Sequence, residues 1–182
     1  MSAHGSILDP VEHSRLLADL DGVCATANVQ QIYVHQSMAE FCNQTEIKWV
    51  ADFRENRAKG IGGLLLTGTL GERYQAIAGA LLRNFIDARV VSVNQLVAAS
   101  NNQGKNSVEI PDPTVLVIPN LFVSSHGKAM TSWQIQALYD ILLGRLTSNR
   151  PTVAYIESVV GLSEAFGVVF AEHLTTHFVQ SS

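Results

Sequence analysis

The stretch LLLTGTLGERYQAIAGALL, residues 64–82, decides the fold of this chain. The apolar run that ends at Thr67 is typical of a buried strand, and Gly68 and Gly71 mark the tight turn after it. The small residues that follow predict a helix over residues 75–86. A strand, a glycine-containing turn and a helix in this order are typical of loops that bind nucleotide phosphates.

The composition limits the kinds of function that this chain can have. Its 182 residues suit one domain with a single sizeable core. Charged residues make up 15%, against about a quarter in typical domains, which favours a surface that contacts other protein chains. The net charge of −4 disfavours nucleic-acid binding that relies on phosphate neutralisation. No apolar run is long enough for a bilayer and the two cysteines lack metal or redox spacing, so we expect a cytoplasmic protein without membrane contact.

The first third of the chain is predicted to be mainly helical. A helix over residues 10–20 is expected to begin at a proline that follows an aspartate. A second helix, over residues 37–53, is predicted from a capping box and from apolar residues at helical spacing. An extended apolar stretch at residues 30–34 precedes the second helix, and a polar connector at residues 54–62 follows it.

The rest of the chain alternates between apolar strands and helices. Continuous apolar strands separated by helices predict a parallel sheet that is covered on both faces, which is a three-layer α/β fold. Ligands bind at the carboxyl ends of the strands in such sheets, so function is sought after each strand. The predicted strands are residues 63–66, 90–93, 114–118 and 152–156, the predicted helices are 75–86, 95–100, 131–146 and 163–178, and a loop spans 101–113.

Three segments in collinear order resemble the AAA+ ATPases that load bacterial replicative helicases, the DnaC/IstB-like group. They are GLLLTG at residues 63–68, VLVIPNL at 115–121 and WQIQALYDILLGRLTSNRPTV at 133–153. The resemblance implies a P-loop NTPase-like AAA+ core over residues 29–182, preceded by a short helical segment at 1–28. It also implies that a fifth strand is short or absent and that there is no lid domain.

The phosphate loop of that family, G-x-x-x-x-G-K-[ST], is degenerate in this chain. Gly68 matches the first glycine, but Arg73 stands at the second, where a side chain obstructs the approach of phosphates to the backbone. Tyr74 replaces the lysine and Gln75 replaces the hydroxyl that binds magnesium. Glu72 adds a negative charge beside a site that would receive a polyanion.

The other nucleotide-site positions of the family are also changed. Pro119 and Asn120 align with the acidic pair that holds Mg²⁺ and orients water. Glu157 aligns with the polar sensor, and His173 aligns with the arginine that completes a neighbour's site. The resemblance therefore predicts a catalytically inactive pseudo-ATPase without cofactors, which works as a scaffold, adaptor or regulator in DNA replication or a mobile element. Its expected partners are further copies of itself, an active AAA+ relative or a replicative helicase.

Two other functions are open alternatives. One is a DNA-binding helicase loader or transposition accessory protein, although a nucleic-acid partner is not favoured. The other is a divergent nucleotide-binding enzyme or metal hydrolase, which requires Arg73 to contact a phosphate or His173 and His177 to bind a metal. The serines and histidine at 124–126 are interpreted as a polar loop. A basic group, usually a solvated face but also a candidate contact for DNA or an acidic partner, comprises Lys48, Arg54, Arg57 and Lys59.

Overall fold

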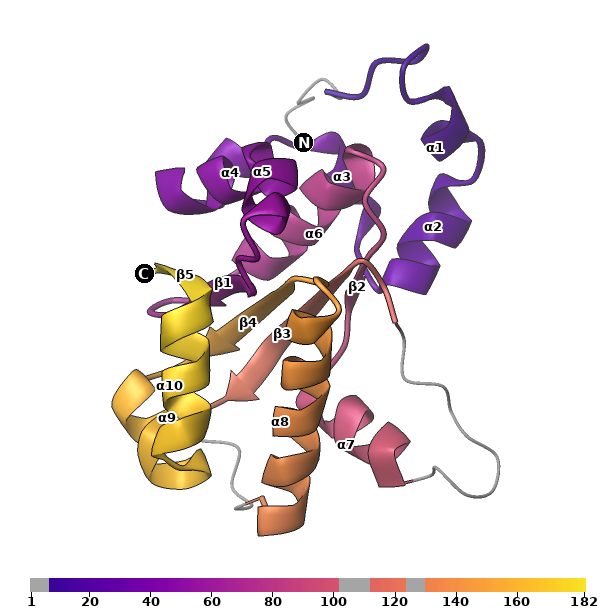
Figure 1. Cartoon of the computed structure of the whole chain (residues 1–182). Helices are drawn as coiled ribbons and strands as arrows, with labels where there is room; N and C mark the ends of the chain where they lie inside the picture. Colours follow the sequence, from indigo (N-terminus) through magenta and orange to yellow (C-terminus); the bar gives the residue numbers. More distant parts are fainter. Residues whose placement is uncertain (1–6, 102–111, 124–129) are drawn as a thin grey trace.

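Five parallel strands form the centre of the molecule in the computed structural model, which describes residues 7–101, 112–123 and 130–182 (Figure 1). The spatial order of the strands is β2-β3-β4-β1-β5. All four neighbouring pairs are parallel, with Leu64 opposite Val153 and Val179 in the central register. The strands are β1 (Gly63–Leu66), β2 (Ala88–Val90), β3 (Val115–Phe122), β4 (Thr152–Ile156) and β5 (Phe178–Ser181).

Helices cover both faces of the sheet, which confirms the predicted three-layer α/β fold (Figure 1). Leu64 and Leu66 of β1 point to one apolar cluster, and Leu65 points to the other, as the alternation of a strand requires. On the first face are α1 (Ser14–Ala18), α2 (Leu20–Ala27), α3 (Gln31–His35), the 3₁₀ helix η1 (Met38–Glu40), α4 (Gln44–Ala51), α5 (Phe53–Ala58) and α6 (Arg73–Arg83). On the second face are α7 (Val93–Asn101), α8 (Ser132–Thr147), α9 (Val159–Phe166) and α10 (Val168–His177).

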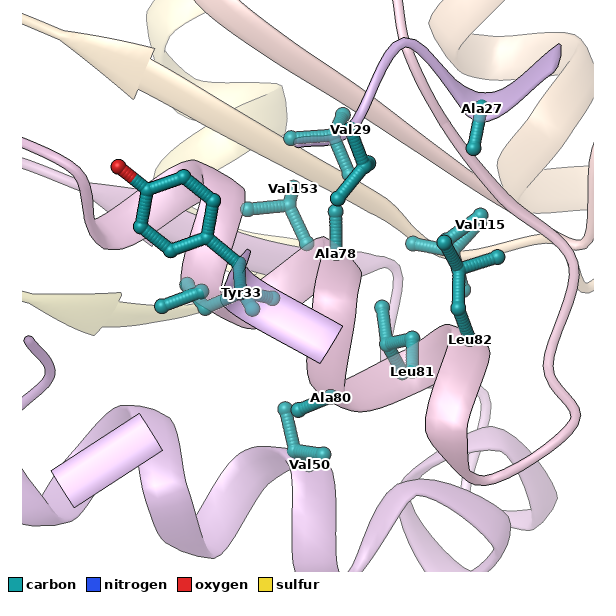
Figure 2. Packing of buried hydrophobic residues seen from close by; sticks show 14 of the residues in the cluster. Ala27, Val29, Tyr33, Val50, Ala78, Ala80, Leu81, Leu82, Val115 and Val153 are labelled. Atoms are coloured by element: carbon teal, nitrogen blue, oxygen red, sulfur yellow. The ribbon is translucent and has the colours of Figure 1, made fainter. Parts of the chain in front are cut away.

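Small residues let other helices pack closely against α6. Figure 2 shows Val50 of α4 directed toward Ala80 of α6. A Cβ atom at Gly79 would lie only 2.4 Å from the carbonyl oxygen of Tyr33, so α3 can occupy its position only if residue 79 is glycine. The tight packing of α3 on α6 fixes the helix that follows the β1 turn.

The helical first third differs in detail from its prediction. Residues 30–34 lie largely in helix α3 and are not extended, because a short apolar run has no period that separates helix from strand. The predicted helix over 37–53 is divided into η1 and α4, and the predicted connector at 54–62 contains most of α5. The cause of the division is a capping box that starts α4: Asn43 accepts from the backbone N–H of Glu46, and Glu46 accepts from that of Asn43.

The end of the chain also differs from its prediction. The predicted helix over 163–178 is interrupted at Gly167, whose φ of 96° favours glycine, and Phe178 begins β5. A fifth strand is therefore present and is four residues long. The predicted strand over 90–93 is displaced, since β2 ends at Val90 and Val93 already begins α7.

Some sequence features cannot be placed. Residues 102–111 of the predicted loop and the polar group at 124–126 lie outside the described residues. Among the helices that are described, none has both the length and the apolar character needed to cross a membrane.

Candidate functional site

The carboxyl ends of β1, β3 and β4 meet at one edge of the sheet, where ligands bind in parallel α/β folds. Residues 67–72 connect β1 to α6 there, and we call them the β1–α6 loop. Its two glycines have φ of 73° and 49°, as the turn requires. The loop is hydrogen-bonded to its neighbours: the N–H of Thr67 donates to the Ser181 carbonyl at 2.7 Å, and the Tyr155 hydroxyl donates to the Gly68 carbonyl at 2.9 Å.

Arg73, the first residue of α6, turns its guanidinium toward the protein interior. The residue is 8% exposed. Its Nη1 donates to the carbonyls of Thr67 and Thr69 at 2.8 and 3.0 Å. Its Nε donates to the Glu46 carboxylate at 2.8 Å, and its Nη2 donates to the same carboxylate. Nη2 also donates to Ser181 Oγ, at 3.2 Å. All three guanidinium nitrogens are therefore bonded within the protein.

Glu46 is the counter-ion of Arg73 and is fully buried. Burial opposes ionisation of its carboxyl, but hydrogen bonds from Arg73 and Ser181, together with the charge of Arg73, outweigh burial and lower the pKa of Glu46 below its ordinary value. The Ser181 hydroxyl donates to Oε1 at 2.8 Å, and the Asn43 N–H donates to Oε2 at 3.1 Å. We call Asn43, Glu46, Arg73 and Ser181 the Arg73 cluster. Its two charges neutralise each other at neutral pH.

The next two residues of α6 are also occupied by contacts within the protein. Gln75 is buried, and its side chain accepts from the Gln30 N–H at 3.0 Å and donates to the Asn28 carbonyl at 3.2 Å. Tyr74 is partly buried and packs on the apolar cluster of the first face. Gln75 stands where the phosphate-loop consensus has a hydroxyl, and it connects α6 to the backbone before α3. Tyr74 stands where the consensus has a lysine, and it connects α6 to the core.

Glu72 places a carboxylate at the N-terminus of α6. It is the N-cap residue of the helix and is exposed to solvent. Burial, together with a hydrogen bond to the Glu72 carboxylate and its negative charge, raises the pKa of Tyr33 to about 12. The positive end of the helix dipole, which attracts phosphate in nucleotide loops, therefore already has a negative charge beside it.

The positions after β3 and β4 supply no acidic pair. Pro119 and Asn120 lie inside β3 rather than beyond it, and Asn120 Oδ1 accepts from the Val93 N–H at 3.1 Å, at the start of α7. Glu157 follows β4 with an exposed side chain, and its N–H donates to the Phe122 carbonyl at 2.9 Å. An amide side chain that serves a helix start is a poor ligand for Mg²⁺, which prefers carboxylate oxygens.

His173 lies in the interior between α8 and α10. Its ring centroid is 5.5 Å from that of Tyr139 and 5.2 Å from that of His177. Burial lowers the pKa of His173, and the charge of His177 adds to this effect, so the imidazole is neutral at pH 7. Its Nε2 has no hydrogen-bond partner within the described part of the chain. Among the described residues, no three His, Cys, Asp or Glu side chains converge on a point that could hold a metal ion.

Two of the four cations of the basic group are ion-paired in the fold, and a third donates to the backbone. Lys48 and Lys59 each form an ion pair with a carboxylate one helical turn away, at 2.8 and 2.6 Å. Arg57 donates to a backbone carbonyl at 3.0 Å. This arrangement is typical of a solvated helix face.

Sequence reasoning missed the partners of Arg73. Glu46, Asn43 and Ser181 received no role from the sequence, although the pattern Asn43-x-x-Glu46 is a readable helix-start signal. Nothing in the sequence links Glu46 to a residue 27 positions later.

Comparisons with known proteins concern the fold. No family model matches the sequence, and no curated protein matches it. The structure is similar to the crystal structure of the DnaC helicase loader, with a TM-score of 0.62 and 13% identity, over 83% of this chain and 98% of that chain. It is also similar to AMPPCP-bound DnaA from Aquifex aeolicus, with a TM-score of 0.55 and 8% identity, over 79% of this chain and 49% of that chain. The chain thus has the α/β P-loop NTPase fold of DnaC-like AAA+ proteins, as the resemblance of its sequence predicts.

Proposed function

We propose that this protein is a catalytically inactive AAA+-fold protein that acts by binding other proteins, as a scaffold, adaptor or regulator in DNA replication or a mobile element. The observation that carries the proposal is the Arg73 cluster, because it places a buried ion pair and two loop carbonyls where a phosphate-binding loop needs free donors.

The energetic argument starts from Arg73, the cation nearest to the absent lysine. To contact a phosphate, its guanidinium has to leave Glu46, which is fully buried. Breaking a buried ion pair costs about 3–5 kcal/mol, because one charge is left without compensation. Such a cost weakens binding by about a hundredfold to several thousandfold. Glu72 adds repulsion at the helix N-terminus where the phosphates would lie.

Neither of the two positions that match the family's acidic pair carries a carboxylate. The positions that match the acidic pair hold Pro119 and Asn120, and the Asn120 amide accepts from the start of α7. Phosphoryl transfer depends on a metal that bridges the phosphates and on a residue that orients the attacking water. Loss of both groups together with the lysine removes each main contribution to catalysis.

A role in protein binding is supported by apolar side chains on the second face. They belong to the start of α8, the start of α9 and the start of α10, and they are 50–69% exposed: Trp133, Val160, Val168 and Val169. Large apolar side chains that remain exposed in the fold are candidate contacts for another protein, and Val168 and Val169 are neighbours in the sequence. The fold likeness to a helicase loader makes a replicative helicase or an active AAA+ relative the first partner to test, followed by a second copy of this chain.

The direct test is isothermal titration of the full chain with ATP and with ADP in the presence of Mg²⁺, alongside a phosphate-release assay. An active AAA+ ATPase at the same concentration is the positive control. We expect no saturable heat and no released phosphate. Micromolar ATP binding with turnover would overturn the proposal.

The partner is tested by size-exclusion chromatography with light scattering, using the purified replicative helicase or AAA+ relative of the same host. Val168→Asp combined with Val169→Asp is expected to abolish co-elution. The matched control is Val11→Asp, which places the same charge at a valine that is 82% exposed outside this group. If the double variant still co-elutes with the partner, these valines are not part of the contact surface. A steep salt-dependent affinity for single-stranded DNA would favour the DNA-binding alternative.

A further inference from the structure

The Arg73 cluster joins three segments that are far apart in the sequence: α4, the start of α6 and the end of β5. Arg73 is 27 residues from Glu46 and 108 from Ser181. Asn43 Nδ2 donates to Ser181 Oγ at 2.8 Å and to the Ser182 carbonyl at 2.9 Å. One compact set of hydrogen bonds thus connects both sides of the β1–α6 loop.

Three members of the cluster, Glu46, Arg73 and Ser181, are buried, and Asn43 lies at its exposed edge. Glu46 is not exposed at all, and Ser181 is 4% exposed. Oε1 of Glu46 accepts from Arg73 and Ser181, and Oε2 accepts from the Asn43 N–H. Each carboxylate oxygen has a donor and each guanidinium nitrogen has an acceptor. Loss of Glu46 or Arg73 therefore leaves a buried charge without its counter-ion, and loss of the Ser181 hydroxyl removes one hydrogen bond from each of them.

The loop itself presents carbonyl oxygens to side chains of the protein. The carbonyls of Thr67 and Thr69 accept from Arg73, and the intervening Gly68 carbonyl accepts from Tyr155. A phosphate-binding loop is ordered by an anion on its N–H groups. This loop is ordered by a cation on its C=O groups.

We propose that the Arg73 cluster is an internal ligand of the β1–α6 loop, which replaces the ordering effect of a nucleotide and makes the loop, the start of α4 and the end of β5 open as one cooperative unit. The inference rests on the proposed function in one respect, namely that the site holds no nucleotide. It adds that the edge of the sheet has a single, ligand-independent conformation for a partner to bind.

The coupling follows from the position of Ser181. Its hydroxyl contacts Asn43, Glu46 and Arg73, and its carbonyl accepts from the Thr67 N–H in the loop. Detaching the end of β5 therefore removes a hydrogen-bond partner from both charges and from the loop backbone together. Opening of one segment makes the other two less stable, which is the physical content of a cooperative unit.

The test is native-state hydrogen exchange of the full chain, read by mass spectrometry of peptides that cover residues 67–72 and 178–182. Glu46→Gln keeps the shape of the side chain and removes its charge, so Arg73 stays buried without a counter-ion. We expect exchange to become about a hundredfold faster in both peptides, and by the same factor. The matched control is Glu55→Gln, which removes an exposed carboxylate paired with Lys59 and is expected to change exchange less than about twofold.

A milder variant keeps the test decisive if Glu46→Gln does not fold. Ser181→Ala removes one hydroxyl and no charge, and it is expected to speed exchange about fivefold to tenfold in both peptides. Faster exchange in only one of the two peptides, or in neither, would overturn the inference.

Failure of this inference is distinguishable from failure of the proposed function. Exchange is measured without nucleotide, and binding of ATP is measured separately by titration. Coupled exchange in a chain that binds ATP would refute the proposed function and the replacement of a nucleotide by the cluster, but not the cooperative unit. Uncoupled exchange in a chain that binds no ATP would refute the internal-ligand inference alone.

Discussion

The triple variant Arg73→Gly, Tyr74→Lys and Gln75→Ser writes a consensus phosphate loop into this chain. In a protein with an intact AAA+ site these residues bind phosphate and magnesium. Here the replaced side chains hold the structure together, since Arg73 neutralises Glu46 and Gln75 bonds to backbone on either side of residue 29. We therefore expect loss of stability and no gain of ATP binding.

The magnitude follows from the contacts. Arg73→Gly leaves the Glu46 carboxylate buried and unpaired, which costs about 3–5 kcal/mol, and glycine in the helix costs about 1 kcal/mol more. Gln75→Ser leaves a backbone N–H and a backbone carbonyl unsatisfied, which costs about 1–3 kcal/mol. The total of about 5–9 kcal/mol is comparable with the whole free energy of unfolding of a typical domain, about 5–15 kcal/mol.

The assay is guanidinium unfolding followed by far-ultraviolet circular dichroism, with ATP titration of each variant. Arg54→Gly is the matched control, because it makes the same substitution in helix α5 at an exposed position and costs only about 1 kcal/mol. Adding Glu46→Gln to the triple variant is expected to recover part of the loss, since it removes the orphaned charge. A triple variant with the wild-type midpoint that binds ATP would refute the reasoning.

Three further outcomes are expected. Burial lowers the pKa of His173, so the unfolded chain gains a proton at higher pH than the folded chain. The free energy of unfolding therefore decreases as the pH falls below about 6.5. Guanidinium midpoints measured at two pH values are expected to show this decrease, and the variant His173→Phe is expected to reduce it. Gly79→Ala is expected to destabilise the protein by about 1–3 kcal/mol, because its Cβ meets the Tyr33 carbonyl. Gly144→Ala, whose Cβ has no heavy atom of the described residues within 4 Å, is expected to stabilise the protein by about 1 kcal/mol. Thermal unfolding measures both, and a change of the same sign in the two variants would contradict this expectation. Phe85 follows α6 with a φ of 58° and is 59% exposed, so Phe85→Gly is expected to raise the melting temperature by about 2–4 °C, and a decrease would show that its ring contributes more than the backbone strain costs.

The strands were predictable because their residues are apolar on both faces. Residues 63–66 and 152–156 were predicted as strands and agree with β1 and β4 residue for residue. Each is a short apolar run bounded by glycine, proline or polar residues, and β4 is rich in β-branched side chains. Residues 30–34 end in a similar apolar run, Ile32–Val34, but lie largely in α3, because packing against α6 decides their conformation and the local sequence does not.

The candidate site was predictable in position but not in its contacts. The glycines of the loop and the order of the strands place residues 67–75 at the ligand-binding edge of the sheet. The environment of Arg73 depends on Glu46 and Ser181, which reach it only through tertiary structure. The sequence alone does not distinguish an arginine that contacts a phosphate from an arginine in a buried ion pair.

The wide spacing of the Arg73 cluster along the chain has a consequence for the order of folding. Its hydrogen bonds close segments of 27, 108, 135 and 138 residues, and the three longest require β5 to be docked beside β1. Contacts that span such long segments form late, after the loop-closure entropy of the sheet has been overcome. We expect substitutions in the cluster to leave the rate of folding nearly unchanged and to accelerate unfolding, so that this small charged group sets how long each folded molecule survives.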